Sequence, residues 1–148
     1  IIGGGVPLYG INRGGNDAPI GMPDLAPTTL GLCGVAVPDW MQGRDFSGVR
    51  VPGRALPADA DSALLQCVVP TGHPDSVDRP WRGVVTRDGW KYVVLENQPW
   101  LLFHLAEDPY EQANHAHNSR FAAERKRLQA LLAGWLEKTG DAFPLPAL

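Results

Sequence analysis

The sequence has little excess charge and no long apolar run. Its 148 residues carry 13 Lys and Arg against 16 Asp and Glu, a formal net charge of −3. Because binding to a nucleic-acid backbone needs concentrated positive charge, we expect no nucleic-acid partner. No apolar run approaches the ~20 residues that a membrane-spanning helix needs, so we expect no membrane insertion. No basic segment precedes an apolar one at the start, so no signal peptide is visible and the compartment stays open.

Cysteine is also scarce, with Cys33 and Cys67 as the two examples. Two cysteines are too few for a disulfide framework or a zinc site, and these lie too far apart for a Cys-x-x-Cys redox motif. Both stand among apolar neighbours, where a thiol behaves as a small hydrophobic group. We therefore expect two buried, inert thiols.

The remaining composition is that of one globular domain, with 44% hydrophobic and 20% charged residues. The 17 Gly and 14 Pro make the chain rich in loops. Residues 1–23 form an irregular lead-in, in which glycines and prolines interrupt any regular element. A short helix is predicted next, with Asp24 as its N-cap and Gly34 as its stop. Its expected buried face consists of Leu25, Thr28, Thr29 and Leu32.

After an extended loop that ends near Asp61, the pattern changes to strands. Apolar runs at 63–69, 81–86, 90–95 and 100–105 predict four strands. Asp88-Gly89 between the second and third is the strongest short-range hairpin signal, and 96–99 form another turn. This close spacing predicts an antiparallel meander.

Two helical features are predicted after the strands. Residues 108–114 fit a single helical turn, capped by Asp108 and left through Asn114. Residues 118–138 fit a longer amphipathic helix that ends near Gly140, followed by a tail at 142–148. Its apolar stripe is Phe121, Leu128, Leu131, Leu132 and Trp135. The predicted fold is α+β: a small four-stranded antiparallel sheet with the C-terminal helix on one face, preceded by a loop-rich segment with one short helix.

Taken in order, several stretches resemble the C-terminal region of type I sulfatases. Residues 24–28 (DLAPT) are similar to the family's D-[IL]-A-P-T helix, and 42–46 (QGRDF) to the segment that follows it. Residues 81–92 (WRGVVTRDGWKY) resemble the family's W-R-[AG]-V-R-T hairpin, and 102–114 (LFHLAEDPYEQAN) its L-[YF]-D-L-x-x-D-P-x-E-x-x-N turn. The resemblance covers 24–141. It departs from the pattern at Val85, where the family favours Arg, and at His104, where it favours Asp.

The resemblance implies a larger α/β enzyme of the alkaline phosphatase superfamily. Its nucleophile is a formylglycine made from the Cys or Ser of C/S-x-P-x-R, and its site holds Ca²⁺ or Mg²⁺ between acidic pairs. Neither Cys33 nor Cys67 stands in that pattern, no Ser does, and the acidic pairs are absent from the sequence. We therefore assign no catalytic or metal residue to this chain and expect it to be inactive by itself. Its expected partners are the missing catalytic core or a second copy of the chain.

The loop at 71–80 and the strand after it hold the candidate substrate-binding residues, His73, Arg79 and Arg82. A loop at the end of a sheet can project into a neighbouring site, and a guanidinium can hold two sulfate oxygens as a planar fork. A plain surface turn shaped by Pro74 and Pro80 is the alternative.

Two further groups of residues have a structural and a functional interpretation. His115 and His117 could share a metal ion, but without a third ligand nearby a solvated loop is favoured. The aromatic residues Trp81, Trp90, Tyr92 and Trp100 could stack on a sugar, although core or interface packing is favoured.

Two other functions stay open. A phosphonate monoester or phosphodiester hydrolase of the same superfamily would share these motifs. A non-catalytic interaction module derived from the subdomain would share them too, and would need to cover its docking face by self-association.

Overall fold

The computed structural model describes residues 17–69, 72 and 77–148 of the chain. The chain divides into two compact units, Ile1–Ser62 (unit 1) and Ala63–Leu148 (unit 2). Each unit has a hydrophobic cluster of its own. None of the helices within the described residues is long and apolar enough to cross a membrane.

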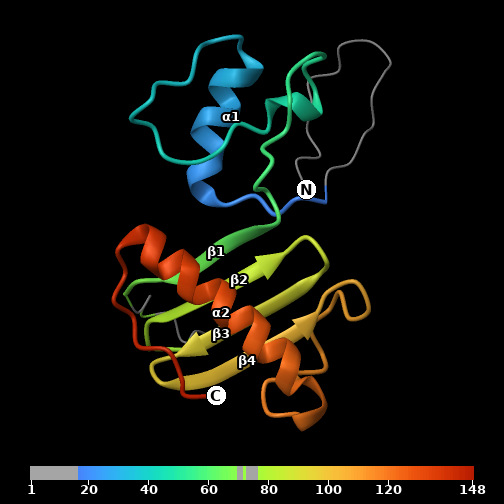
Figure 1. Ribbon diagram of the computed structural model, residues 1–148, viewed down its shortest axis with the longest axis vertical. Coiled ribbons are helices and arrows are strands. Elements are labelled where there is room, and N and C mark those ends of the chain that lie inside the picture. Colours follow the sequence, from blue (N-terminus) through green and yellow to red (C-terminus); the bar gives the residue numbers. More distant parts are fainter. Residues whose placement is uncertain (1–16, 70–71, 73–76) are drawn as a thin grey trace. The chain divides into compact units, whose positions relative to one another are not determined.

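One open four-stranded sheet forms the frame of unit 2 (Figure 1). Its strands lie side by side in sequence order: β1 (Ser62–Cys67), β2 (Trp81–Thr86), β3 (Trp90–Leu95) and β4 (Gln98–His104). β2 pairs antiparallel with β3, and β3 with β4. Gly89 closes the β2–β3 hairpin with a φ of 89°, a conformation that glycine adopts without steric cost. The predicted antiparallel meander is confirmed.

β4 begins two residues earlier than predicted. The turn before it is only Glu96 and Asn97, and Asn97 takes a positive φ of 56°. Pro99 is accommodated because the register shifts at this point: Val93 pairs with Leu101 but Val94 with Pro99. Proline lacks the N–H of a regular ladder, so an edge strand with a bulge is where it fits.

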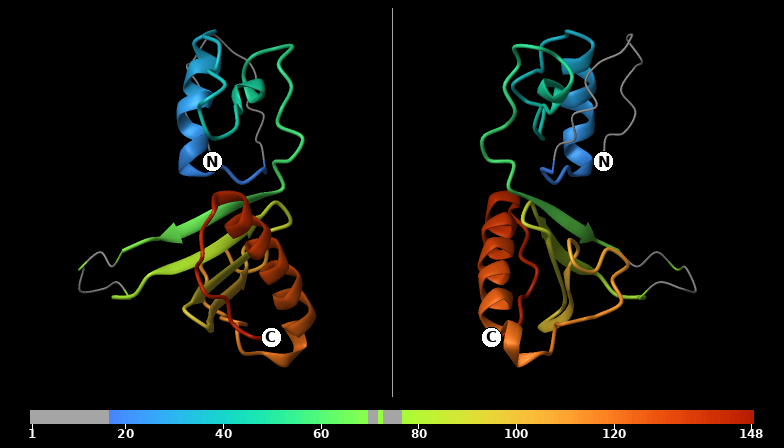
Figure 2. Two further views of the ribbon diagram at one scale, coloured as in Figure 1. Left: turned by 60° about the vertical axis from the view of Figure 1, so that its left-hand side comes forward. Right: turned by 90° about the vertical axis from the view of Figure 1, so that its right-hand side faces the viewer.

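The C-terminal helix α2 (Ala122–Thr139) covers one face of the sheet (Figure 2). A 3-10 turn, η3 (Ser119–Phe121), leads into it, and the Asn118 side chain accepts a hydrogen bond from the Arg120 N–H at 3.0 Å. Gly140 ends it in the left-handed conformation, as predicted. The buried helix residues are Leu128, Leu132 and Leu136, and they pack on a sheet face formed by Val84, Tyr92, Val94 and Leu102. The α+β fold is therefore confirmed.

The segment after β4 does not form the predicted helical turn. Glu111, and not Asn114, carries the positive φ, at 55°. The Asn114 side chain is held at the sheet edge instead, where its Oδ1 accepts from the Leu102 N–H at 3.0 Å and its Nδ2 donates to the Trp100 carbonyl at 2.9 Å. These bonds along β4 fix the segment in a non-helical path.

The last residues, 142–148, are packed against unit 2. The Asn97 N–H donates to the Pro144 carbonyl at 3.1 Å, and Gln129 Nε2 donates to the Pro146 carbonyl at 2.6 Å. Phe143 and Leu145 pack against the hydrophobic cluster of the unit. The segment that the sequence sets apart as a tail is thus part of the packed structure.

The described residues of unit 1, 17–62, carry three short helical elements joined by loops: η1 (Met22–Asp24), α1 (Leu25–Leu32) and η2 (Ser47–Val49). Gly34 follows α1 with a φ of 73°, consistent with the predicted stop. Asp24 stands at the N-cap position of α1, as predicted, but its side chain makes no cap bond to the helix and bonds to the backbone of Gly21 and Arg44 instead.

Of the predicted buried face of α1, Thr28 is buried as expected and the rest of the prediction is wrong. The helix buries Pro27, Thr28 and Gly31, while Leu25 and Leu32 are 46% and 45% exposed. A Cβ on residue 31 would overlap the carboxylate of Asp45, so the close packing on this side depends on glycine. The helix is apolar on nearly all sides, so its sequence pattern does not indicate which side is buried.

Candidate functional site

Arg82 is buried in unit 2 and held by several partners. Its Nε lies 2.5 Å from Asp141 Oδ2, and its Nη1 donates to the carbonyls of Cys67 and Trp81 at 3.0 Å each. The guanidinium carbon lies 4.8 Å from the centre of the Phe143 ring. The side chain is 7% exposed, so in this arrangement the guanidinium joins β1, β2 and the residues after α2. This ion pair could not be predicted from local sequence pattern, because the two partners are 59 positions apart.

The other two candidate substrate-binding residues lie differently. His73 lies outside the described residues. Arg79 stands before β2 and is exposed. Of the two described candidates, Arg79 is therefore the accessible one, and its predicted role in sulfate binding stays a prediction.

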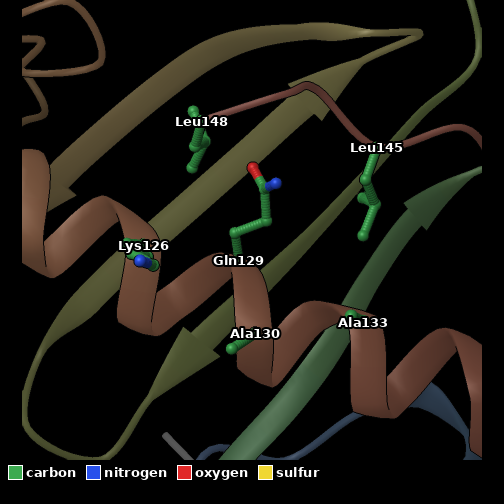
Figure 3. A pocket seen from close by; sticks show the side chains of 6 residues that line it. All are labelled: Lys126, Gln129, Ala130, Ala133, Leu145 and Leu148. Atoms are coloured by element: carbon green, nitrogen blue, oxygen red, sulfur yellow. The ribbon is translucent and has the colours of Figure 1, made fainter.

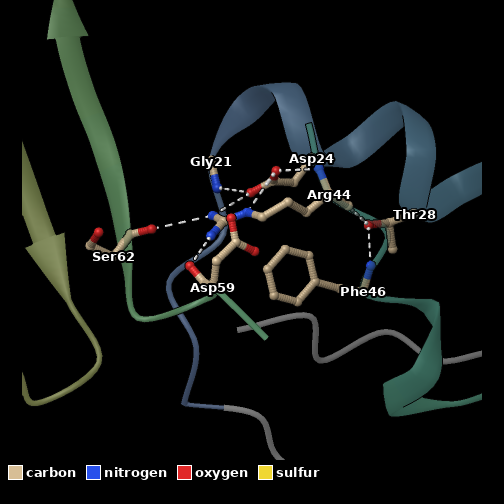
Figure 4. A network of polar contacts seen from close by, with 7 residues as sticks. All are labelled: Gly21, Asp24, Thr28, Arg44, Phe46, Asp59 and Ser62. Atoms are coloured by element: carbon tan, nitrogen blue, oxygen red, sulfur yellow. Dashed lines mark hydrogen bonds and ion pairs between the residues drawn. The ribbon is translucent and has the colours of Figure 1, made fainter. Parts of the chain in front are cut away.

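Unit 1 contains a buried ion pair that the sequence did not single out (Figure 4). Asp24 is 4% exposed, and its Oδ2 lies 3.2 Å from Arg44 Nη2. Asp24 also accepts from the backbone N–H groups of Gly21 and Arg44, at 2.8 and 2.7 Å. The Arg44 guanidinium donates to the carbonyls of Asp59 and Ser62 at 3.0 and 3.3 Å. These bonds satisfy both buried charges, which is the condition under which a buried pair is tolerated.

Thr28 connects this pair to the small hydrophobic cluster of the unit. Its Oγ1 accepts from the Phe46 N–H at 3.0 Å and donates to the Arg44 carbonyl at 3.3 Å. The Phe46 ring is 1% exposed and lies 5.3 Å from the Arg44 guanidinium carbon. The DLAPT and QGRDF stretches are therefore joined in space, and their shared role in the described structure is to hold α1 against the 44–47 segment.

A third ion pair fixes the turn after β4. Lys91 Nζ lies 2.7 and 2.8 Å from the two carboxylate oxygens of Glu111. Beside it, the Ala113 N–H donates to Asp108 Oδ2 at 2.8 Å, and this bond holds the pKa of Asp108 below its ordinary value. The Asp-Pro-x-Glu sequence thus forms a turn whose two carboxylates each have a partner.

The aromatic residues are divided between several environments. Tyr92 is in the core, and burial raises its pKa to about 12. Trp90 packs on His104 and Phe121, with ring centres 4.6 and 5.7 Å apart. Trp81 and Trp100 face each other at 6.5 Å and are half-buried. Core packing therefore accounts for Tyr92, as favoured, and the four aromatic residues do not form one stacking platform.

The described cysteines and histidines belong to no cluster that could hold a metal ion. Among the described residues, no three His, Cys, Asp or Glu side chains lie together in a way that could hold a metal ion. His115 stacks on Phe121 at 4.3 Å. Both cysteines are free thiols; Cys33 is exposed, which corrects its predicted burial, and Cys67 is half-buried.

A hollow of about 250 Å³ lies between α2 and the C-terminal segment (Figure 3). It is lined by Lys126, Gln129, Ala130, Ala133, Leu145 and Leu148. Lys126 is the one charged group in this lining, and Gln129 already bonds to the Pro146 carbonyl. The hollow lacks the converging polar groups of an active site.

Comparison with known proteins gives relatives in both sequence and structure. No family model matches the chain. The ulvan-active sulfatase of Formosa agariphila is 32% identical over 129 residues, which are 86% of this chain and 24% of that protein. A protein solved in complex with its substrate, D-glucosamine-2-N,6-O-disulfate, is 27% identical with a TM-score of 0.63 over 82% of this chain and 24% of its own.

The chain matches the C-terminal region of a type I sulfatase. It spans about a quarter of the length of these two relatives. The phosphonate monoester hydrolase of Agrobacterium radiobacter is also similar, at 25% identity and a TM-score of 0.55 over 78% of this chain and 24% of that one. The predicted resemblance to the sulfatase C-terminal region is therefore confirmed.

Proposed function

We propose that this chain is the C-terminal subdomain of a sulfuric ester hydrolase. In this proposal it acts together with a catalytic part that lies outside the 148 residues. The observation that carries the proposal is the 32% identity to a sulfatase over 86% of the chain. The relatives are about four times as long, which leaves room in them for a separate catalytic part.

In this proposal the reacting groups belong to the catalytic part. The chain has no C/S-x-P-x-R sequence from which formylglycine could form. Its described side chains also do not fit a Ca²⁺ or Mg²⁺ site, because no cluster of carboxylates and histidines is available within residues 17–69, 72 and 77–148. We therefore assign the cation of the family to the catalytic part.

The contribution of this chain to the substrate pocket is one wall. Arg79 is the described residue best suited to meet a sulfate oxygen pair, because its guanidinium is exposed and can present a planar fork. His73 is its proposed companion. Arg82 supports the wall by holding β1, β2 and Asp141 together. The proposed substrate is the sulfate ester of a sugar, since one relative was solved with a disulfated glucosamine.

The isolated chain should therefore show no sulfatase turnover. Pure chain incubated with nitrophenyl sulfate and either Ca²⁺ or Mg²⁺ is expected to release no nitrophenol above the buffer rate. Metal-dependent release by the pure chain would contradict the proposal, because the catalytic groups would then have to lie within these 148 residues.

The gene gives a second test. We expect the DNA upstream of the codon for Ile1 to continue in frame and to encode C/S-x-P-x-R together with paired acidic metal ligands. A start codon at or just before Ile1 would contradict the hydrolase proposal and favour a non-catalytic interaction module that associates with a second copy.

A phosphonate monoester or phosphodiester hydrolase is the second candidate, supported by the likeness to the Agrobacterium enzyme. The whole gene product, assayed side by side on nitrophenyl sulfate and on a phenyl phosphonate monoester, distinguishes the two. A higher kcat/KM on the sulfate ester supports the sulfatase proposal, and a higher value on the phosphonate supports the alternative.

A further inference from the structure

Trp81 and Trp100 form a half-buried pair outside the hydrophobic cluster of unit 2. Their ring centres lie 6.5 Å apart, and the ring planes are tilted by 55°. β2 and β4 are the strands on either side of β3, so the two rings meet across β3. Neither ring belongs to the cluster beneath α2 or to the partly buried residues packed against it. A tryptophan with an apolar side and a wet side is typical of binding surfaces.

Trp100 is the extra residue of the β-bulge in β4. Val93 pairs with Leu101 and Val94 with Pro99, so Trp100 has no partner of its own on β3. A bulge of this kind changes the direction of a side chain, and bulges are over-represented beside functional sites. The position of one ring of the pair therefore depends on a local irregularity of the sheet, which a regular ladder would not provide.

Two kinds of polar group accompany the rings. Neither indole N–H donates a hydrogen bond to another described residue, so each can donate to an oxygen atom of a ligand. Arg79 is exposed and stands two residues before Trp81, so their Cα atoms are at most about 7 Å apart. An apolar surface with a few donors and one cation fits a ligand that has an apolar face, several oxygen atoms and a negative charge.

We propose that Trp81 and Trp100 form a stacking site for the sugar ring of a sulfated saccharide, and that Arg79 binds a sulfate group of that saccharide. This inference rests on the proposed function and adds to it the residues that recognise the sugar. The face of a pyranose ring carries C–H groups that pack on an indole, and its hydroxyl groups lie around the rim, within reach of the indole N–H groups. The guanidinium recognises the sulfate through two parallel hydrogen bonds.

The test titrates the full 148-residue chain with D-glucosamine-2-N,6-O-disulfate and follows the indole N–H signals by NMR. The chain has five tryptophans, and each signal is assigned by one Trp→Phe variant. We expect the signals of Trp81 and Trp100 to shift along a saturating curve, with a Kd in the millimolar range because the site is small and open. The signals of Trp40 and Trp135 should stay in place. Trp40 is 79% exposed, so it controls for unspecific contact with an accessible indole.

Substitutions separate the contributions of the rings and the cation. Trp81→Ala and Trp100→Ala should each raise the Kd about fivefold, and the matched control Trp40→Ala should leave it unchanged. Arg79→Gln should raise the Kd of the disulfate about fivefold and leave that of unsulfated N-acetyl-D-glucosamine unchanged. Hydrogen exchange of the β3 amides checks that each variant is folded. Because Arg79 is exposed, Arg79→Gln tests the site even where a tryptophan variant does not fold.

Three results would overturn the proposal: no shift of the Trp81 and Trp100 signals, equal shifts of the Trp40 signal, or the same shifts with inorganic sulfate alone, which would indicate an anion site without sugar recognition. The upstream reading frame keeps the two proposals separate. Saturable binding that depends on Trp81 and Trp100, together with an upstream frame that lacks C/S-x-P-x-R, would preserve the sugar site and reject the sulfatase function. Hydrolysis of sugar sulfates by the whole gene product, without any shift of these two signals, would do the opposite.

Discussion

At the scale of single residues, each unit contains one buried arginine that stabilises its interior. Arg44 pairs with Asp24 in unit 1, and Arg82 pairs with Asp141 in unit 2. In both, further guanidinium N–H groups donate to backbone carbonyls, so the cost of taking the charge out of water is offset by several hydrogen bonds. Removing one member of such a pair leaves the other charge buried and unpaired.

Arg44→Met should therefore unfold unit 1 and leave unit 2 intact. Loss of a partner from a buried pair costs about 3–5 kcal/mol, which is a large fraction of the free energy of unfolding of a small unit. Hydrogen exchange should show the α1 amides losing their protection while β3 keeps it.

Arg54→Met is the matched control for this substitution. Arg54 also pairs with an aspartate, Asp45, but the two side chains are 35% and 27% exposed. A pair this accessible to water is worth at most about 1 kcal/mol, so α1 should keep most of its protection. Equal effects of the two substitutions would contradict the structural role given to Arg44.

At the scale of elements, one polar connection links the sheet, α2 and the C-terminal segment. Tyr92 of β3 donates its hydroxyl hydrogen to Gln129 Oε1 of α2 at 2.9 Å, and Gln129 donates to the Pro146 carbonyl. Tyr92 is fully buried, and burial raises its pKa from 10 to about 12, with the nearby Arg125 acting in the opposite direction.

This connection predicts a pH dependence. The pKa of Tyr92 is higher in the folded chain than in the unfolded one, so its contribution to stability is complete below pH 10 and is lost as the pH rises through about 12. At pH 8, Tyr92→Phe should lower the free energy of unfolding by about 1 kcal/mol, because Gln129 Oε1 loses its donor.

Urea unfolding measured between pH 8 and pH 12 checks this prediction. The difference in stability between wild type and Tyr92→Phe should shrink above pH 10, because wild type alone has this phenol to ionise. Tyr110→Phe serves as the control, since Tyr110 is 83% exposed and should follow wild type at every pH. A constant difference between wild type and Tyr92→Phe would count against the buried phenol as its cause.

At the scale of the whole molecule, the hydrophobic cluster of unit 2 is complete within its own range. All of its members, from Val84 to Leu136, and all the partly buried residues around them lie between Leu64 and Leu145. Every described member of this cluster belongs to unit 2. The sheet and α2 therefore have what they need for a cooperative fold.

Residues 63–148 expressed alone should fold. We expect a cooperative thermal transition and dispersed amide NMR signals, with a melting temperature within about 5 °C of the more stable transition of the full chain, since a change of 1 kcal/mol shifts Tm by roughly this amount in a small domain. A fragment that stays unfolded or aggregates would show that unit 2 depends on residues before Ala63.

The sequence by itself determined the order and type of most elements. Asp88-Gly89 located the central hairpin, the 81–86 and 90–95 strands have the predicted bounds, and Gly140 ends the long helix. The stripe that contains Leu128 and Leu132 identified the buried side of that helix, although Leu136 was missed. These features depend on turn chemistry and periodicity within a few neighbouring residues, which is why the sequence reports them. The family resemblance rests on the same short stretches.

Only the tertiary structure decided which side of α1 is buried, where Asn114 lies, and which candidate arginine is accessible. An apolar helix without a polar side offers no pattern from which to choose a face, so close packing at Gly31 made the choice. Asn114 was predicted to end a helical turn, but its side chain bonds to backbone groups at the edge of β4 that would otherwise lack partners. Arg82 met Asp141 across 59 positions, a distance over which local sequence pattern carries no information about pairing.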